Sequence, residues 1–379
     1  MELDEQDYDE LEYSVHEILD DCNTRQIPYQ EEDIIDSFIE FVPDISDEIQ
    51  EIIEQSIDSY YDLYQEKVLE EDEKTIIRNK LVALQNVYQP QQKTEEWYEY
   101  RNSLITASSA WKILKSQNTL NSYIYEKCCP YVPKNGLSGS HSLQWGVMFE
   151  PISLEIYQRR NQTCVAEFGC ISHPHYSFLG ASPDGINIDE SSPLFGTMVE
   201  VKNIVNREIT GIPKSEYWIQ MQLQMEVCDL DHCDFLETRF KKMEIQDGIT
   251  TLLESGILIQ GTNHNNNDIR RFLIIDSTFT KERIEQWIQQ SLSEFEYSEI
   301  IHWYLDEYSC IPIKRDREWF QQNIEKFKEA WQIIQQEKVT GYEHRKPKKR
   351  ESGPNIHLFT EEENQEYQNS KKIKVNKIE

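Results

Sequence analysis

Two hydrophobic periodicities alternate along the middle of the chain. Apolar residues recur at helical spacing from Leu143 to Tyr157 and from Tyr217 to Val227, which predicts two amphipathic helices. Shorter apolar or alternating runs that end at turn-forming residues are typical of strands. Such runs occupy residues 164–172, 178–182, 198–202, 233–240 and 271–275. Because helices and strands are interspersed, the pattern predicts an α/β fold in which a mixed central sheet is flanked by helices.

Helical periodicity also occurs before and after these segments. Thr94 is placed to cap a helix that continues through Arg101, and a second helix follows from Ser108. Residues 281–306 and 316–337 predict two long helices rich in tryptophan. Residues 1–80 carry apolar positions at helical spacing, and prolines divide them into several short amphipathic helices. Those apolar positions are Val15, Ile18, Leu19, Ile34, Phe38, Ile39, Ile45, Ile49, Ile52 and Ile53.

Charge is distributed very unevenly. The 379 residues include 69 acidic and 38 basic ones, a net charge of −31, which by itself argues against DNA as a partner because phosphate binding needs lysine and arginine. However, residues 1–80 contain 27 acidic and only 5 basic residues, so most of the excess belongs to one end. The change in composition predicts an acidic helical N-terminal extension (1–90), a central domain (91–340) and a mixed-charge, disordered tail (341–379).

The two charged ends allow several interpretations that the residues do not separate. The extension is either a solvated helical appendage, a docking arm for a partner, or a DNA mimic that occludes a basic groove. The basic run at 344–350 is either a nuclear import signal, a nonspecific DNA contact or a solubilising segment.

Composition also limits where the protein can work. The chain has no run of about 18 apolar residues, so no membrane span is predicted. Its first residues lack the basic and apolar regions of a secretory signal, so we expect an intracellular protein. The 8 cysteines form no CxxC pair, which favours reduced core thiols. The weaker alternative is a zinc site of nonstandard spacing made by Cys164, Cys170, His173 and His175.

The candidate chemistry lies on two neighbouring predicted strands. Asp184 follows the first, and the second carries Glu200 and Lys202, which face the same side because they are two residues apart. A carboxylate beside an ammonium suits a dry core poorly, but it suits a divalent cation held against a phosphate. Asp184, Glu200 and the Val201 carbonyl would share the ion, and Lys202 would orient the attacking water or stabilise charge on the phosphate. An ion pair at the sheet surface is the alternative.

Pro183-Asp184 followed by Glu200-x-Lys202 resembles the PD-(D/E)xK nuclease motif. More specifically, residues 94–240 resemble the family of bacteriophage lambda exonuclease and YqaJ-type viral recombinase nucleases. Five blocks agree with that family in order. They are Trp97–Arg101 with Ile105–Ser108, Trp145–Gly146 with Phe149–Glu150, Gly180–Gly185, Val199–Lys202 and Tyr217–Gln222. The resemblance implies a restriction-endonuclease-like core of the PD-(D/E)xK class.

The resemblance also implies roles for single residues. Two Mg²⁺ ions are implied, with Mn²⁺ as a substitute, and their ligands would be Glu150, Asp184, Glu200 and the Val201 carbonyl. The catalytic set would be completed by Lys202 and Gln220, whereas the place of Gln222 stays open. The 5′ phosphate of a DNA end would be bound by Arg101, Ser108 and Ser182, a role that suits a guanidinium and two hydroxyls.

An activity follows from the same resemblance. We expect a Mg²⁺-dependent DNA exonuclease that resects duplex ends 5′ to 3′ in viral DNA recombination, repair or replication. The alternatives are an endonuclease or nickase of the same fold and a non-catalytic DNA-binding replication scaffold. The expected partners are double-stranded DNA ends, a single-strand annealing protein and further copies of the chain in a trimer. The expected source is a large DNA virus, and the expected location is the host nucleus, a cytoplasmic viral factory or the virion.

Overall fold

The structure is a computed structural model that describes most of the chain from residue 69 to residue 347. The described residues are 15, 53, 56, 69–131, 141–243, 254–264, 267–276 and 278–347. The chain forms two compact units, one of Met1–Trp111 with Tyr131–Lys328 and one of Lys112–Pro130 with Glu329–Glu379. None of the helices in the described ranges is both long enough and apolar enough to span a bilayer.

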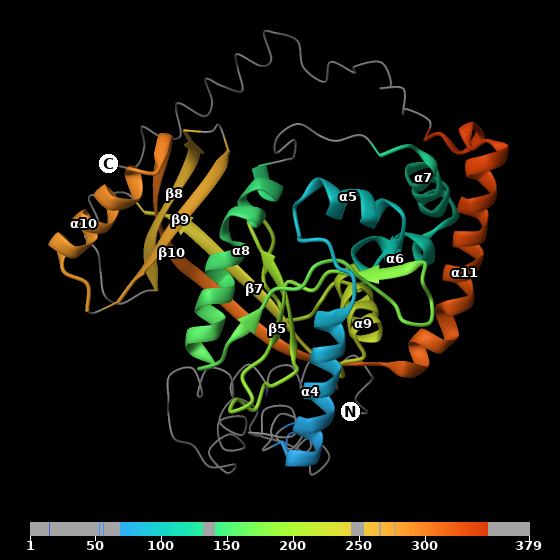
Figure 1. Cartoon of the computed structure of the whole chain (residues 1–379), viewed down its shortest axis with the longest axis horizontal. Helices are drawn as coiled ribbons and strands as arrows, with labels where there is room; N and C mark the ends of the chain where they lie inside the picture. Colours follow the sequence, from blue (N-terminus) through green and yellow to red (C-terminus); the bar gives the residue numbers. More distant parts are fainter. Residues whose placement is uncertain are drawn as a thin grey trace, which may run out of the picture. The chain divides into compact units, whose positions relative to one another are not determined.

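The larger unit is built on a seven-stranded sheet of order β2-β5-β6-β7-β10-β8-β9 (Figure 1). Its strands are β2 (Val165–Ala166), β5 (Gly185–Asn187), β6 (Met198–Asn203), β7 (His232–Lys242), β8 (Ser255–Asn263), β9 (Asp268–Ile275) and β10 (Phe295–Lys314). Strands β6 and β7 run parallel, whereas the other neighbours run antiparallel. The predicted mixed sheet of an α/β fold is therefore confirmed.

A second, three-stranded sheet has the order β1-β4-β3. Its strands are β1 (Ile105–Thr106), β3 (Ile171–Ser172) and β4 (Leu179–Ala181). Thr106 pairs with Gly180 in the parallel β1–β4 ladder. Because both strands end within one or two residues of this pair, Ser108 and Ser182 leave the sheet at the same edge.

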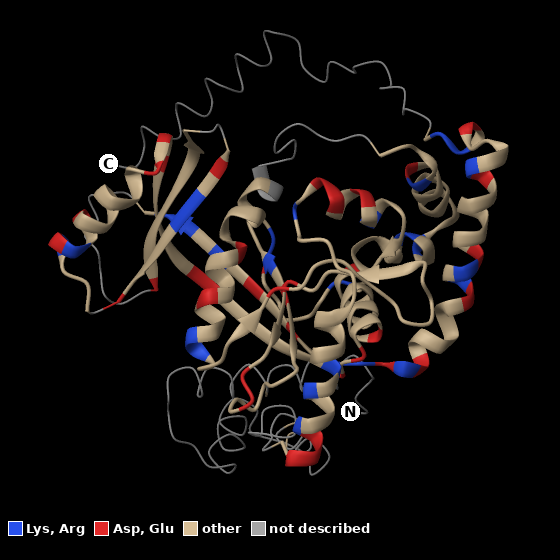
Figure 2. Ribbon diagram, in the orientation of Figure 1, with Lys and Arg blue, Asp and Glu red and all other residues tan. Residues whose placement is uncertain are grey.

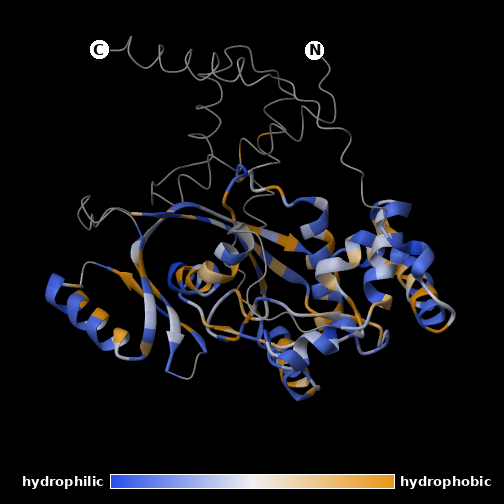
Figure 3. Cartoon of the chain, turned by 90° about the horizontal axis from the view of Figure 1, so that it is seen from above, coloured by the Kyte–Doolittle hydropathy of each residue, from blue (hydrophilic) through white to orange (hydrophobic). Residues whose placement is uncertain are grey.

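Helices of the larger unit flank the central sheet. They are α4 (Glu71–Asn86), α5 (Glu95–Asn102), α8 (His141–Arg160), α9 (Ser215–Cys228) and α10 (Lys281–Leu292). Helices α8 and α9 lie on opposite faces of β6: Val199 and Val201 pack with Tyr157 of α8, whereas Glu200 between them is bonded by Gln220 of α9. Figure 3 shows hydrophobic and hydrophilic residues alternating along the helices, as the burial of one face requires.

The remaining helices belong wholly or partly to the smaller unit. Helices α6 (Ala107–Lys115) and α11 (Arg317–Thr340) cross its limits, and α7 (Gln117–Cys128) and η2 (Glu343–Arg345) lie within it. In η2, the Arg345 guanidinium forms two hydrogen bonds of 2.6 Å with the Glu337 carboxylate. The first residues of the predicted tail are thus structured, and residues 348–379 lie outside the described ranges. The predicted domain limits stay a prediction.

The predicted helix over residues 281–306 is wrong in its second half. Helix α10 ends at Leu292, and Phe295 begins β10, which is 20 residues long. The first part of β10 pairs with β8 and the second with β7, with a bulge between Leu305 and Glu307. The buried residues Ile301, Trp303 and Leu305 recur every second position, which is strand periodicity.

Helix α8 carries the main aromatic core. Its Phe149 is fully buried and stacks on Phe240 of β7 with ring centroids 4.6 Å apart, and Trp145 lies at the same distance from Phe149. Trp303 of β10 meets Phe149 edge to face. Trp145 is therefore a core residue, and the next residue after Phe149, Glu150, is held at a defined place by this packing.

Three residues of the segment 1–68 are described. Val15, Ile53 and Ser56 are helical, and the side chains of Val15 and Ile53 are fully buried, as their helical spacing predicts. The other predicted helices of residues 1–68 lie outside the described ranges. Seven cysteines are described, and all are free thiols, which agrees with the absence of a CxxC pair.

Candidate active site

The candidate catalytic residues gather where β5 stops covering the edge of β6. Gly185 of β5 pairs with Val199, so β6 has no β5 neighbour from Glu200 onward. Asp184 occupies this edge: its Oδ2 accepts a hydrogen bond of 2.8 Å from the Val201 N–H. The local strand geometry thus brings Asp184 against the segment that carries Glu200 and Lys202, as the motif spacing predicts.

Glu200 is enclosed by donors from its own strand and from α9. Its side chain is 1% exposed, and one oxygen forms an ion pair with Lys202. Gln220 Nε2 donates to Oε1 at 2.6 Å, and Gln224 Nε2 donates to Oε2 at 2.7 Å. A buried carboxylate is tolerated only when its charge is compensated and its lone pairs are satisfied. These three donors meet that requirement and fix the orientation of Glu200.

Three carboxylates influence one another at this edge. Burial raises the pKa of Asp184 well above its usual value, and the charges of Glu200 and Glu150 raise it further. Burial alone would lower the pKa of Lys202, but Glu200 and Asp184 raise it above its usual value, so Lys202 is held as the ammonium. The structure therefore brings Glu150, Asp184, Glu200 and Lys202 together.

The donor set fits a hard divalent cation in its chemistry. A partly buried group of three carboxylates with mutually unfavourable charges is stabilised by a cation, and Mg²⁺ prefers oxygen ligands. Within the described part of the chain, no group of three or more His, Cys, Asp or Glu side chains is arranged to hold a metal ion. Two of the carboxylates form ion pairs, Glu200 with Lys202 and Glu150 with Lys93.

The predicted phosphate-binding residues form one cluster beside this group. Arg101 on α5 donates from Nη1 to Ser182 Oγ (3.2 Å) and from Nη2 to Ser108 Oγ (2.9 Å). Trp97 Nε1 also donates to Ser182 Oγ at 3.1 Å, and the Arg101 guanidinium lies 4.2 Å from the Trp97 ring centroid. Ser182 lies two residues before Asp184, so the cluster adjoins the carboxylates.

Lys93 occupies an unusual turn at the entrance to α5. The Thr94 N–H donates to the Gln91 carbonyl at 3.4 Å, and Lys93, the third residue of this turn, has φ of 67°. That position favours glycine, and an L side chain there costs about 1–2 kcal/mol. The Lys93 ammonium lies 2.9 Å from Glu150 Oε1, with side chains 47% and 25% exposed. Such an exposed ion pair contributes about 0–1 kcal/mol, which does not offset the backbone cost.

The sequence alone assigned no role in this site to Gln224 or Trp97. Gln224 bonds Glu200 and, more weakly, the Ser182 carbonyl at 3.4 Å. It lies one helical turn after Gln220, so the spacing of four was the available signal. Gln222 points away and binds backbone groups of Lys314 and Asp316. Trp97 is only partly buried and contacts both Ser182 and Arg101.

The alternative zinc site is not formed by its four candidates. His173 Nδ1 accepts the backbone N–H groups of His175 (3.0 Å) and Tyr176 (3.1 Å), and its ring stacks on Phe320. Cys170 is buried, whereas Cys164 is exposed. His173 therefore serves to hold its own loop.

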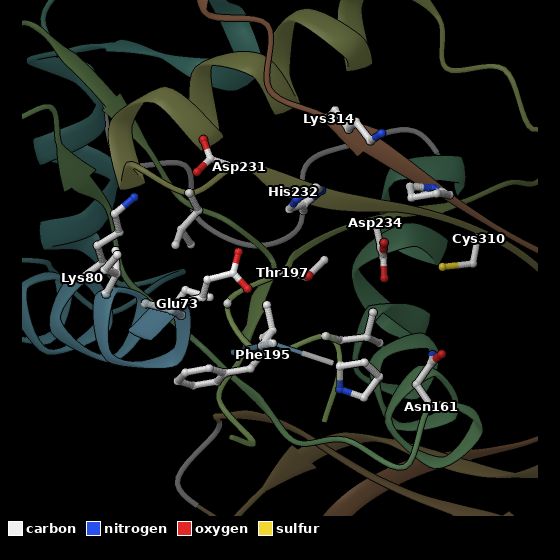
Figure 4. Close-up of a pocket in the computed structure, with 18 of the residues that line it drawn as sticks. Glu73, Lys80, Asn161, Phe195, Thr197, Asp231, His232, Asp234, Cys310 and Lys314 are labelled. Carbon is white, nitrogen blue, oxygen red and sulfur yellow. The ribbon is translucent and has the colours of Figure 1, made fainter. Parts of the chain in front are cut away.

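A cavity of about 790 Å³ lies on the other face of the sheet. Figure 4 shows lining residues from several elements, among them Glu73 and Lys80 of α4 and Asp234 of β7. Asp234 pairs with Val199, so both point away from Glu200. Of the described lining residues, none belongs to the carboxylate group or to the phosphate-binding cluster. The cavity is separate from the candidate chemistry.

A match to a protein family covers the three carboxylates, Lys202 and the cluster of Arg101, Ser108 and Ser182, but not Lys93. Residues 96–231 match the family model of the YqaJ-like viral recombinase domain. The resemblance predicted from the five sequence blocks is thereby confirmed. The matched region begins at the second residue of α5 and ends immediately before β7. It contains the three carboxylates, Lys202, Gln220, Gln224 and the cluster of Arg101, Ser108 and Ser182.

The similarity to one viral protein covers more of the chain than the family match does. An uncharacterized protein of Acanthamoeba polyphaga mimivirus is 25% identical over 341 residues, which cover 76% of this chain and 62% of that protein. The chain thus spans about 62% of the length of this viral relative.

Two solved structures are similar to part of the chain. An alkaline exonuclease (LHK-Exo) from Laribacter hongkongensis is 20% identical, covers 65% of this chain and 94% of its own, and gives a TM-score of 0.42. A phage-related exonuclease from Haemophilus somnus is 15% identical, with coverages of 62% and 94% and a TM-score of 0.35.

Proposed function

We propose that this chain is a Mg²⁺-dependent DNA exonuclease that starts at duplex ends and resects them 5′ to 3′. The observation that carries the proposal is that two groups of residues adjoin each other at the end of one strand. Arg101, Ser108 and Ser182 converge on one point, and Asp184, two residues further, belongs to the group of carboxylates. A terminal phosphate and a scissile phosphate would thus be bound within one site. The family match supports a DNA exonuclease.

The end-binding cluster explains why an end is preferred. A guanidinium binds phosphate oxygens in a planar, bidentate manner, and hydroxyls donate to the same oxygens. Arg101 is already oriented by Ser108, Ser182 and its packing on Trp97, so little side-chain freedom would be lost on binding. A 5′-terminal phosphate carries more negative charge than an internal phosphodiester, which favours it at this cluster.

Lys202 supplies the fixed positive charge of the hydrolytic step. It remains protonated because Glu200 and Asp184 raise its pKa, so it would donate hydrogen bonds to the phosphate oxygens or to the attacking water. Gln220 and Gln224 hold the Glu200 carboxylate in place, and the Val201 N–H holds Asp184. Glu150, Asp184, Glu200 and the Val201 carbonyl would hold divalent ions, for which Mn²⁺ would substitute. Such ions supply Lewis acidity and activate water.

End-labelled DNA tests the proposal directly. A linear duplex carrying one label at a 5′ or a 3′ end should lose the 5′ label first, and only with Mg²⁺ present. Asp184→Asn or Lys202→Ala should abolish cleavage while the far-ultraviolet circular dichroism spectrum stays unchanged. A closed circular duplex is the control, since an end-dependent enzyme leaves it intact. Cleavage of the circle would favour an endonuclease or nickase, and full activity of Asp184→Asn would refute the mechanism.

Partners and setting extend the proposal. The single strand left by resection would be used by an annealing protein in viral recombination, repair or replication, in the host nucleus or a cytoplasmic viral factory. Assembly into a trimer would enclose the duplex, which light scattering in solution would test. The acidic first turn of α4 and the glutamates of α5 (Figure 2) show that negative charge continues into the described residues. DNA would therefore approach through the local basic groups Arg101 and Lys202.

A further inference from the structure

The segment that joins α4 to α5 is fastened to the strand end that carries Asp184. Gln92 Nε2 donates to the carbonyls of Phe168 (2.9 Å) and Pro183 (3.0 Å), and Pro183 immediately precedes Asp184. The Gly169 N–H donates to Gln89 Oε1 at 2.8 Å. A Cβ at Gly169 would lie 2.3 Å from the Pro90 carbonyl oxygen, so the approach is close. The segment is thus anchored on both sides of Pro90.

This anchoring places the ammonium of Lys93 beside Glu150, although 47% of the Lys93 side chain stays exposed. The residue stands in the left-handed backbone region, where glycine is favoured, and its ammonium contacts Glu150. The contact is too exposed to repay the backbone cost, so the fold gains nothing from lysine at this position. A strained residue at the edge of a functional site points to a role in that site.

We propose that Lys93 is a resident counter-cation of Glu150 that competes with the divalent ion for this carboxylate. The inference rests on the proposed function, because Glu150 is a metal ligand only there. The ammonium occupies an oxygen of Glu150 and turns the side chain toward α5. Removal of the lysine charge frees Glu150, so a divalent ion binds more tightly.

Lys93 differs from Lys202 in three respects. Lys202 lies within β6, is 21% exposed and contacts Glu200, whereas Lys93 lies in a turn, is 47% exposed and precedes the matched family range. Lys202 is held by two carboxylates and stays close to any bound phosphate. Among the described residues, Lys93 forms an ion pair with Glu150, and it can swing into solvent when an ion takes its place, since its ammonium is well hydrated.

The test measures binding of Mn²⁺ alone to the full chain without DNA, by electron paramagnetic resonance of the free ion. Lys93→Ala and Lys93→Gly should both bind roughly three- to fivefold more tightly than the natural chain, as expected for loss of a partly exposed ion pair. Lys93→Arg should keep the natural affinity because it keeps the charge. Lys281→Ala is the matched control, since Lys281 is an exposed lysine of α10 that pairs with Glu285 on its own helix.

The glycine variant separates charge from backbone strain. It should unfold at a higher temperature than Lys93→Ala, although both bind Mn²⁺ equally. Affinity that rises in Lys93→Gly alone would assign the effect to strain and overturn the proposal, as would unchanged affinity in both variants. Asp184→Asn identifies the site. If Asp184→Asn abolishes Mn²⁺ binding but the Lys93 variants bind Mn²⁺ as the natural chain does, only this inference is refuted. If no Mn²⁺ binding depends on Asp184, the proposed function is refuted as well.

Discussion

Asp234 gives the most direct quantitative check on the electrostatics of the sheet. It is 7% exposed, and its Oδ2 accepts a 2.6 Å hydrogen bond from the Tyr157 hydroxyl. Burial raises the pKa of Asp234 from 3.8 to about 6, although the bond from Tyr157 opposes the shift. The carboxyl is therefore more easily protonated in the folded chain than in the unfolded one. Its contribution to stability is fully present below pH 3.8 and is lost as the pH rises through 6.

The size of this effect follows from the pKa difference. About 2 units, at 1.36 kcal/mol per unit, correspond to roughly 3 kcal/mol of destabilisation at pH 7. Asp234→Asn removes the ionisation but retains an oxygen that accepts from Tyr157. We expect the variant to be about 3 kcal/mol more stable than the natural chain at pH 8 and nearly equal to it at pH 4.

Urea unfolding followed by tryptophan fluorescence, at intervals from pH 4 to pH 8, measures this difference. Asp268→Asn, a change at an exposed position on β9, is the control for removal of one negative charge and should show no comparable pH dependence. A difference between Asp234→Asn and the natural chain that is the same at pH 4 and pH 8 would refute the reasoning, because the ionisation would then not be linked to folding.

Three further predictions concern the site and its support. Gln224→Leu should lower Mn²⁺ affinity and the rate of digestion by about tenfold or more, since a bond to a buried carboxylate contributes about 1.5–3 kcal/mol; Gln222→Leu should affect unfolding alone. Arg101→Ala should slow digestion of 5′-phosphorylated ends far more than of 5′-hydroxyl ends, and equal loss on both would remove its role. Phe149→Ala should lower the free energy of unfolding by about 3–5 kcal/mol in urea titrations, because it opens the core under Glu150.

The sequence predicted the elements whose periodicity is unambiguous and failed where two periodicities overlap. Helices α8 and α9 and strands β4, β6 and β7 were predicted from apolar runs whose spacing and length are typical of one kind of element, although β4 and most of α9, β6 and β7 are buried on both faces. Residues 295–314 were misassigned because α10 and β10 are separated by only two residues and both are rich in aromatic and aliphatic side chains. The strand state was decided by pairing with β7 and β8, which are distant in sequence.

The site was predictable to a different degree. Motif spacing placed Asp184, Glu200 and Lys202 at one sheet edge, and the family resemblance added Glu150, Arg101, Ser108 and Ser182. The role of Gln224 needed the helix periodicity of α9 to be followed one turn further. The contact of Lys93 with Glu150 could not be read from spacing, because it depends on a turn of positive φ anchored to Pro183.

The arrangement of strands sets a lower limit on the length of an active fragment. The family match stops at residue 231, but Glu200 pairs with Phe235 of β7, and β7 has β10 along its other edge. A polypeptide that ended at residue 231 would lack β7, so one edge of β6 would have no strand to pair with. During translation the same order applies: the carboxylates leave the ribosome early, yet the sheet that positions them closes only after Lys314 has been made. An incomplete chain would therefore lack the sheet that positions these carboxylates.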